Sequence, residues 1–332
     1  MSATDLIAPH YSRWEYFQGE EYIPIALESL IAIQQVDADV YLRVGERFIL
    51  YRHKMIPFSS EDRRRLHENR VTHLFVQKRE KRQFFQSLEN QIHRVINASD
   101  VHPMEKSSLL YHSSVNLVEE IFEVDNLSAE VSRSKKLIST YVGFLLQGKE
   151  AQNSVVSMSG HDYYTYKHSV EVCTYAITLA MRLGIHDHKT LKSIGLGGLF
   201  HDIGKKKIPS AIINKPGKLT EEEWALMQKH VTFGLELAGR EVLKDPVASA
   251  IVRYHHESLD GSGYPYGLQA NDLPIEAKIA AAVDTFSALT GDRAYSKAKN
   301  SYDALLVMKN FVGKRFESDV FKQLVLMFRK PE

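Results

Sequence analysis

Two adjacent histidines, His255 and His256, are the residues of this chain that most directly indicate chemistry. Packing rarely requires two neighbouring imidazoles, and imidazole is the commonest side-chain ligand of metal ions in proteins. Glu257 follows them, and then the run DGSGYP at 260–265, whose glycines and proline predict a shaped loop rather than a continuing helix. Metal ligands that open onto a shaped loop predict a site built for catalysis.

Further side chains of the metal-binding type fall on the apolar faces of predicted helices. His168 lies four residues before Val172, and His255 lies four residues after Ile251, so each shares the buried side of its helix. The full set is His168, His201, Asp202, His230, His255, His256 and Asp284. One such residue alone would more often be a hydrogen-bonded core residue. Burying the whole set without a cation would leave several costly polar groups, which a metal centre in a helical bundle satisfies together.

Apolar periodicity predicts that these residues lie in an all-helical C-terminal domain, residues 151–332. Helices are expected at 166–183, 190–203, 220–239, 246–256, 275–289 and 301–316. Thr220 and Glu223 predict a capping box at the start of one of them. Residues 96–150 predict a helical connector, which Pro103 interrupts.

Residues 1–95 instead predict a small α/β domain. Apolar residues alternate over 36–44, and 48–51 and 73–76 have the composition of further strands. A serine cap and an acidic first turn predict a helix over 61–69. This part has no ligand motif, which favours a sensory or docking module, and its signal is not indicated. The fold class is therefore mainly α, with a small N-terminal α/β domain.

Composition indicates an ordinary globular protein of two domains. The chain has 332 residues, of which 44% are hydrophobic and 25% charged. Its formal net charge of +1 does not favour nucleic acid polymers or membranes as partners. The sequence shows no secretory signal and no apolar run long enough to span a bilayer, and its single cysteine, Cys173, cannot form an internal disulfide. We therefore expect a cytoplasmic protein.

Together these motifs resemble the HD-GYP domain, a form of the HD superfamily of metal-dependent phosphohydrolases. The shared elements are HDIGK at 201–205, KPGKLT at 215–220, His230, the run from His255 to Pro265, Asp284 to Leu289, and Arg293 with Tyr295. The resemblance covers roughly residues 150–330 and implies an HD-type helical bundle that acts as a bacterial cyclic di-GMP phosphodiesterase. The N-terminal part resembles, more weakly, the small α/β module found before some HD-GYP domains.

The resemblance also implies two metal ions. The implied ligands of the first are His168, His201, Asp202 and Asp284, and those of the second are His230, His255, His256 and the bridging Asp202. The family favours iron and then manganese, although sites of imidazole and carboxylate suit several first-row ions. Members that bind a third metal have a glutamate four residues before the first histidine. Tyr164 stands at that position, so we expect no third metal.

As the bridging carboxylate, Asp202 would hold the cations roughly 3.5–4 Å apart, where they share a hydroxide and stabilise both oxygens of an in-line displacement. The implied reaction is hydrolysis of a phosphodiester of cyclic di-GMP to pGpG, with further cleavage to GMP left open. Lys205 is assigned to the substrate phosphate or to protonation of the leaving oxygen, and Arg293 to a phosphate or to a structural ion pair. Gly263 and Tyr264 would contact the phosphate, or their loop would act only as a lid.

Two other functions stay open. The domain could be a receptor for cyclic di-GMP, or a protein-docking module, with an intact metal site and little turnover. It could also be an HD hydrolase of another cyclic dinucleotide. The family's GYP loop is implicated in docking to diguanylate cyclase (GGDEF) domains, so proteins with such domains are expected partners, and a homodimer is also compatible with the sequence. Val231, Ala294 and Ser296 depart from frequent family residues without removing a ligand, and would retune substrate binding.

Overall fold

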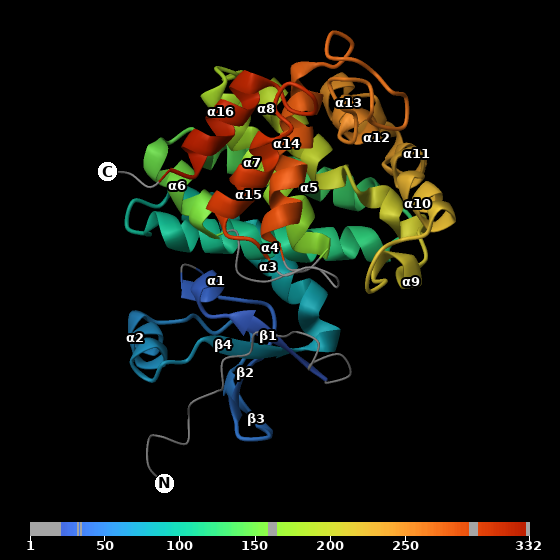
Figure 1. Ribbon diagram of the computed structural model, residues 1–332. Coiled ribbons are helices and arrows are strands. Elements are labelled where there is room, and N and C mark those ends of the chain that lie inside the picture. The colour runs from blue at the N-terminus through green and yellow to red at the C-terminus, as the bar shows by residue number, and fades with distance from the viewer. Residues whose placement is uncertain (1–20, 32, 34, 159–164, 292–297, 330–332) are drawn as a thin grey trace. The chain divides into compact units, whose positions relative to one another are not determined.

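The computed structural model describes residues 21–158, except 32 and 34, together with 165–291 and 298–329 (Figure 1). The chain divides into two compact units, residues 1–113 and 114–332. The structure is mainly helical with one small sheet, which confirms the fold class predicted from the sequence. Arg293, Tyr295 and Tyr164, which enter the expectations drawn from the sequence, lie outside the described residues.

The first unit is built on a four-stranded antiparallel sheet in the order β1-β4-β2-β3. Its strands are β1 (Tyr22–Ala26), β2 (Val40–Val44), β3 (Arg47–Arg52) and β4 (His73–Gln77). The predictions of strands at 48–51 and 73–76 are confirmed. The predicted strand over 36–44 is too long, because the ladder begins at Val40 and the carbonyl of Val36 instead accepts the Met55 amide in a turn.

Four helices of the described residues complete the first unit. They are α1 (Glu28–Ile31), α2 (Ser60–Glu68), η3 (Lys78–Glu80) and α3 (Lys81–Asn97). Ser59 and Asp62 form a capping box at the start of α2, where the sequence predicts a serine cap. Phe84, Leu88 and Ile92 lie on one face of α3 and are buried, so this face belongs to the core of the unit.

In its described residues, the second unit contains helices and isolated β-bridges but no strand. Its first helix, α4 (Pro103–Glu123), crosses from the first unit. The others are α5 (Ser128–Leu145), α6 (Lys149–Met158), α7 (Thr165–Arg182), α8 (His188–Phe200), η4 (Ile203–Lys207), α9 (Ser210–Ile213), α10 (Glu221–Gln228), α11 (His230–Leu237), α12 (Gly239–Leu243), α13 (Pro246–Tyr254), α14 (Ile275–Thr290), α15 (Ser301–Lys309) and α16 (Ser318–Met327).

The core of the second unit lies where α7 packs against α8 and α14, and where α13 packs against α8, α11 and α14. Figure 1 shows α7 and α14 at the centre of the bundle. Alanines, valine and isoleucine on α14 are buried, which allows close packing of the neighbouring helices. Among the described residues, no helix is both long enough and apolar enough to cross a bilayer.

Two helix predictions are wrong in their extent. The segment 220–239 is not one helix, because α10 ends at Gln228 and α11 begins at His230. The two parts have different surroundings: α10 buries no residue, whereas α11 buries His230 and Gly234 against the rest of the bundle. The segment 301–316 is helical only to Lys309, and a turn with Gly313 at positive φ follows. The capping box of Thr220 and Glu223 is confirmed.

Candidate metal centre

Seven candidate ligands converge in the core of the second unit from five different parts of the chain. His168 lies on α7, His201 and Asp202 in the turn after α8, His230 at the start of α11, His255 and His256 after α13, and Asp284 on α14. All are buried except His256, which is half-buried. The structure therefore brings together every residue that the sequence predicts as a ligand.

The first group surrounds one oxygen of each aspartate. His168 Nε2 lies 3.0 Å from Asp284 Oδ1 and 3.6 Å from Asp202 Oδ2. His201 Nε2 lies 3.3 Å from Asp202 Oδ2 and 3.7 Å from Asp284 Oδ1. His168, His201 and Asp202 each offer a ligand atom within 4.8 Å of the others, so one cation could contact all three.

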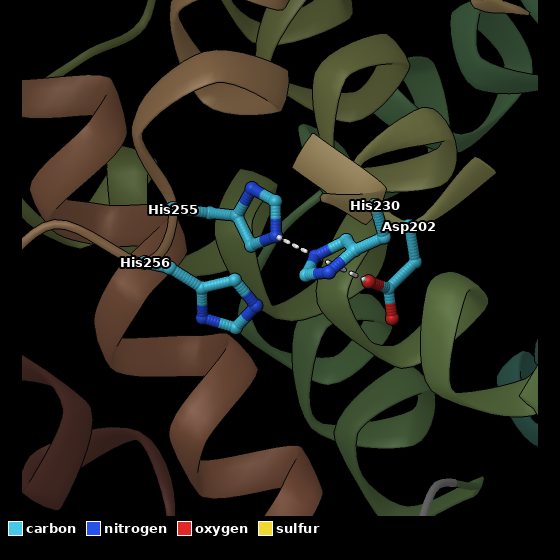
Figure 2. A group of neighbouring side chains, drawn as sticks. All are labelled: Asp202, His230, His255 and His256. Atoms are coloured by element: carbon cyan, nitrogen blue, oxygen red, sulfur yellow. Dashed lines mark hydrogen bonds and ion pairs between the residues drawn. The ribbon is translucent and has the colours of Figure 1, made fainter. Parts of the chain in front are cut away.

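The second group comprises Asp202, His230, His255 and His256, whose ligand atoms also lie within 4.8 Å of one another. Figure 2 shows these four side chains pointing toward a common centre. His230 Nε2 lies 3.4 Å from Asp202 Oδ1 and 3.3 Å from His255 Nε2. The ring of His256 places Nδ1 3.8 Å from Asp284 Oδ2.

Asp202 belongs to both groups, and it does so through different atoms. Its Oδ2 faces His168 and His201, whereas its Oδ1 faces His230. A carboxylate placed in this way could contact one cation in each group.

Backbone carbonyls fix the orientation of three of the histidines. The Nδ1 of His201 lies 2.7 Å from the Gly198 carbonyl oxygen, that of His230 lies 2.7 Å from Met227, and that of His255 lies 3.1 Å from Ile251. A carbonyl only accepts, so each Nδ1 must carry the proton and donate it. The neutral ring then presents an unprotonated Nε2 to the centre, which is the form that binds a metal.

His168 is oriented by side chains instead. Its Nδ1 lies 2.8 Å from Ser287 Oγ, and the Ser287 hydroxyl donates to Glu171 Oε2 over 2.6 Å. Ser287 and Glu171 are both buried, and the sequence analysis did not predict that they belong to the site. Their spacing carried a signal, because Glu171 follows His168 by three residues and Ser287 follows Asp284 by three, which puts each pair on one helix face.

Burial keeps most of these histidines neutral. It lowers the pKa of His168, His230, His255 and His256, that of His255 to about 3. His201 differs, because the nearby aspartates outweigh the effect of burial and raise its pKa. Neutral imidazoles are available to a cation without first losing a proton.

The two aspartates are ionised. Burial opposes their charge, but Lys205 and His201 outweigh it at Asp202, and hydrogen bonding to His168 does so at Asp284. The pKa of each carboxyl is held well below its usual range. Two buried carboxylates among neutral imidazoles form a site of negative charge that a cation would stabilise.

Several buried atoms of the centre have no suitable partner among the described residues. His201 Nε2 and Asp202 Oδ1 make no hydrogen bond, which costs free energy inside a protein. The Nε2 atoms of His230 and His255 face each other at 3.3 Å, although both rings carry their proton on Nδ1. Two lone pairs aimed at one point repel unless a cation lies between them, so these residues fit a bound metal.

The part of the chain that carries these residues is similar to known proteins. Residues 149–320 match the family model described as HD domain. The chain belongs to the HD domain family. Its motifs are those of the HD-GYP form, as the sequence predicts.

Curated relatives of this HD domain protein include phosphodiesterases of cyclic dinucleotides. A cyclic di-GMP phosphodiesterase of Pseudomonas aeruginosa is 36% identical over 200 residues, which are 59% of this chain and 47% of that protein. A 3′3′-cGAMP-specific phosphodiesterase of Vibrio cholerae is 42% identical over 132 residues, which are 40% of this chain and 25% of that protein. The chain thus spans less than half the length of these relatives.

A solved structure shares the fold of both units. An HDG"Y"P protein from Bdellovibrio bacteriovorus matches with a TM-score of 0.67 at 24% identity, covering 91% of this chain and 98% of that chain.

Gly204 explains how the HD motif reaches the second group of ligands. A Cβ atom at this position would lie 1.8 Å from the carbonyl oxygen of His230 and 2.4 Å from the amide nitrogen of Gly234. Only glycine allows η4 to contact α11 so closely. This contact brings His230 beside Asp202.

The loop at 260–265, which contains the GYP motif, packs against the segment that carries His255, His256 and Glu257. Glu257 is buried, and its carboxylate accepts the backbone amides of Tyr266 at 2.7 Å and Leu268 at 3.0 Å. A Cβ at Gly263 would lie 2.4 Å from the backbone of Glu257, so close packing of the loop already requires this glycine. The ring of Tyr264 stacks on His256 with centroids 4.7 Å apart. The loop thus covers the second group.

Lys205 contacts the bridging carboxylate directly. Its Nζ lies 2.5 Å from Asp202 Oδ2, and its side chain is partly exposed. An ammonium group at the edge of the first group is placed to meet an anion that approaches from solvent.

Proposed function

We propose that this HD domain protein is a metal-dependent phosphodiesterase that hydrolyses cyclic di-GMP to linear pGpG. The observation that carries the proposal is Asp202, whose two oxygens face two separate groups of histidines. The relatives named as cyclic di-GMP phosphodiesterases support the substrate.

In this proposal the chain holds two divalent ions. The ligands of the first are His168, His201, Asp202 and Asp284, and those of the second are His230, His255, His256 and Asp202. Imidazole and carboxylate donors suit first-row ions, and we expect iron, with manganese as the alternative. When bound, two such ions supply an activated water as nucleophile and neutralise charge that builds on the phosphoryl oxygens.

The other residues of the centre would act on the substrate. Lys205, which lies beside Asp202, would hold a phosphate oxygen or protonate the leaving oxygen. Arg293 would bind a second phosphate oxygen. Tyr264, whose ring covers His256, would contact the substrate beside the second ion, and Gly263 would offer its backbone amide. Docking of a diguanylate cyclase domain to this loop stays a prediction.

The first test measures turnover and metal content together. Protein loaded anaerobically with iron or manganese is mixed with cyclic di-GMP, and the products are separated by chromatography. We expect pGpG and about two metal ions per chain, as a bridged pair requires. Asp202→Asn should lose metal from both groups and turnover with it. His188→Ala, which changes an exposed histidine of α8, should keep both and serves as the control.

Two results would contradict the proposal. Turnover that survives in Asp202→Asn would overturn the assignment of the bridging ligand. Tight binding of cyclic di-GMP by metal-loaded protein without any pGpG would favour the receptor function.

A second substrate is favoured by a specific observation, because the relative that is 42% identical is named for 3′3′-cGAMP. The same assay with both dinucleotides in one mixture compares their kcat/KM values directly. Faster consumption of 3′3′-cGAMP would identify it, rather than cyclic di-GMP, as the preferred substrate. The proposed metal centre would stay the same.

A further inference from the structure

A pocket of about 500 Å³ lies in the second unit outside the seven candidate ligands. Its walls come from α9, from the loop between α9 and α10, and from α10. The lining residues include Ile212, Ile213, Lys218, Leu219, Trp224 and Met227. The walls are mainly apolar, and Trp224 is 48% exposed. A large aromatic ring left open to solvent in an apolar hollow is typical of a ligand site.

The pocket adjoins the metal centre through two of its lining residues. The carbonyl of Met227 accepts the Nδ1–H of His230, so the pocket wall and a candidate ligand are directly bonded. On the other side, the ring of Trp224 lies 6.0 Å from that of Tyr264, which in turn stacks on His256. A phosphodiester bound at the centre would therefore have this pocket as a neighbour.

Two contacts hold the pocket open in a defined shape. Thr220 and Glu223 form the capping box that starts α10 and thereby places Trp224 one residue later. Glu223 also forms an ion pair of 2.6 Å with Lys215, which ties α10 to the loop that contributes Lys218 and Leu219 to the pocket. A preformed pocket binds its ligand without the entropic cost of ordering the walls.

We infer that this pocket binds one purine base of the cyclic dinucleotide, with Trp224 as the stacking surface. The inference rests on the proposed function, because a base reaches the pocket only when its phosphate lies at the metal centre. Every nucleobase offers a flat aromatic face, and stacking on an aromatic side chain is its usual contact in proteins. Lys218, at the exposed side of the pocket, adds a positive charge near the nucleotide.

Kinetics of three variants test the inference. Trp224→Ala should raise KM for cyclic di-GMP by about 5- to 150-fold, the effect of losing one stacked base, and should change kcat less. Trp224→Phe keeps an aromatic face and should restore most of the affinity. Metal content should stay at the level of the unaltered protein in both variants. Tyr302→Ala removes an aromatic side chain that is 73% exposed on α15, and should leave KM unchanged.

Fluorescence tests base binding without turnover. The chain has two tryptophans, and Trp14 lies outside the described residues. In Trp14→Phe, Trp224 is the only tryptophan, and excitation at a wavelength that tyrosine does not absorb reports on Trp224 alone. We expect GMP to quench this emission in metal-loaded protein, and inorganic phosphate to leave it unchanged.

The outcomes separate the two proposals. An unchanged KM in Trp224→Ala, in a protein that still hydrolyses cyclic di-GMP, would overturn the base pocket alone. Absence of hydrolysis by the unaltered protein would overturn the proposed function, whereas quenching by GMP would still support a base pocket. Equal quenching by GMP and by inorganic phosphate would show that the signal does not come from stacking, and would overturn the inference.

Discussion

At the scale of single residues, the centre depends on which atom of each side chain faces inward. Carbonyls one turn back along the chain take the Nδ1 protons of His201 and His230, so the metal-binding nitrogen is chosen by local helix geometry. His168 instead depends on Ser287 and, through it, on Glu171. A hydrogen-bonding partner at the end of such a chain polarises the hydrogen bond that orients the ring.

Glu171 makes the free energy of unfolding depend on pH. Burial raises the pKa of its carboxyl from an ordinary 4.5 to about 7, and the hydrogen bond from Ser287 only partly opposes this. The folded protein therefore keeps a proton that the unfolded chain releases. The free energy of unfolding is largest below about pH 4.5 as far as this group is concerned, and falls as pH rises to about 7.

We expect Glu171→Gln to remove this decline. Denaturant unfolding of chelated protein at pH 5 and pH 8 measures it, and the loss between the two should be smaller in the variant by on the order of 3 kcal/mol. Glu150→Gln changes an exposed glutamate on α6 and should behave like the unaltered protein. Equal pH profiles for the unaltered protein and Glu171→Gln would show that Glu171 is not protonated in the fold.

At the scale of elements, the centre depends on how closely η4 and α11 approach. The turn after α8 carries His201 and Asp202, and α11 carries His230. Gly204 permits their contact, because any side chain there would overlap the backbone of α11. The break between α10 and α11 has a related consequence: α10 stays at the surface with Trp224 while α11 enters the core.

Gly204→Ala should therefore destabilise the second unit by at least about 3 kcal/mol, the upper range for overpacking, because backbone cannot move aside as a flexible side chain can. It should also reduce bound metal, since His230 would be displaced from Asp202. Gly143→Ala is the matched control. Nothing lies within 4 Å of a Cβ at that helical position, so the change should stabilise α5 by about 0.5–1 kcal/mol. Equal stability of the two variants would contradict the close contact.

At the scale of the whole molecule, a bound metal would stabilise the second unit directly but not the first. All seven candidate ligands belong to residues 114–332, and none belongs to the described part of the first unit. A ligand that binds only the folded state stabilises the unit that contains its site, by about 2.7 kcal/mol when the free ion is at 100 times its Kd.

Metal removal should therefore affect the units unequally. We expect a chelator to increase hydrogen exchange in α7, α8, α13 and α14, which carry or flank the ligands, and to leave the sheet of the first unit unchanged. Exchange followed by mass spectrometry resolves these segments. A similar increase in β1 to β4 would contradict the location of the metal in the second unit.

The sequence by itself determined the candidate ligands and the family. Histidine and aspartate on otherwise apolar helix faces are conspicuous because burying them together is costly without a cation. Local signals also predicted the serine cap of α2 and the capping box of α10, since a cap involves residues only a few positions apart.

Only the tertiary structure decided how those residues are used. Asp202 faces both groups of histidines because two elements distant in the sequence, α7 and α11, approach its two oxygens. The contact of Ser287 with Glu171 spans 116 positions, and the pocket of Trp224 depends on the break before α11. Helical periodicity assigns a residue to a buried face, but it does not tell which other face it meets, because that is set by packing between segments far apart in the chain.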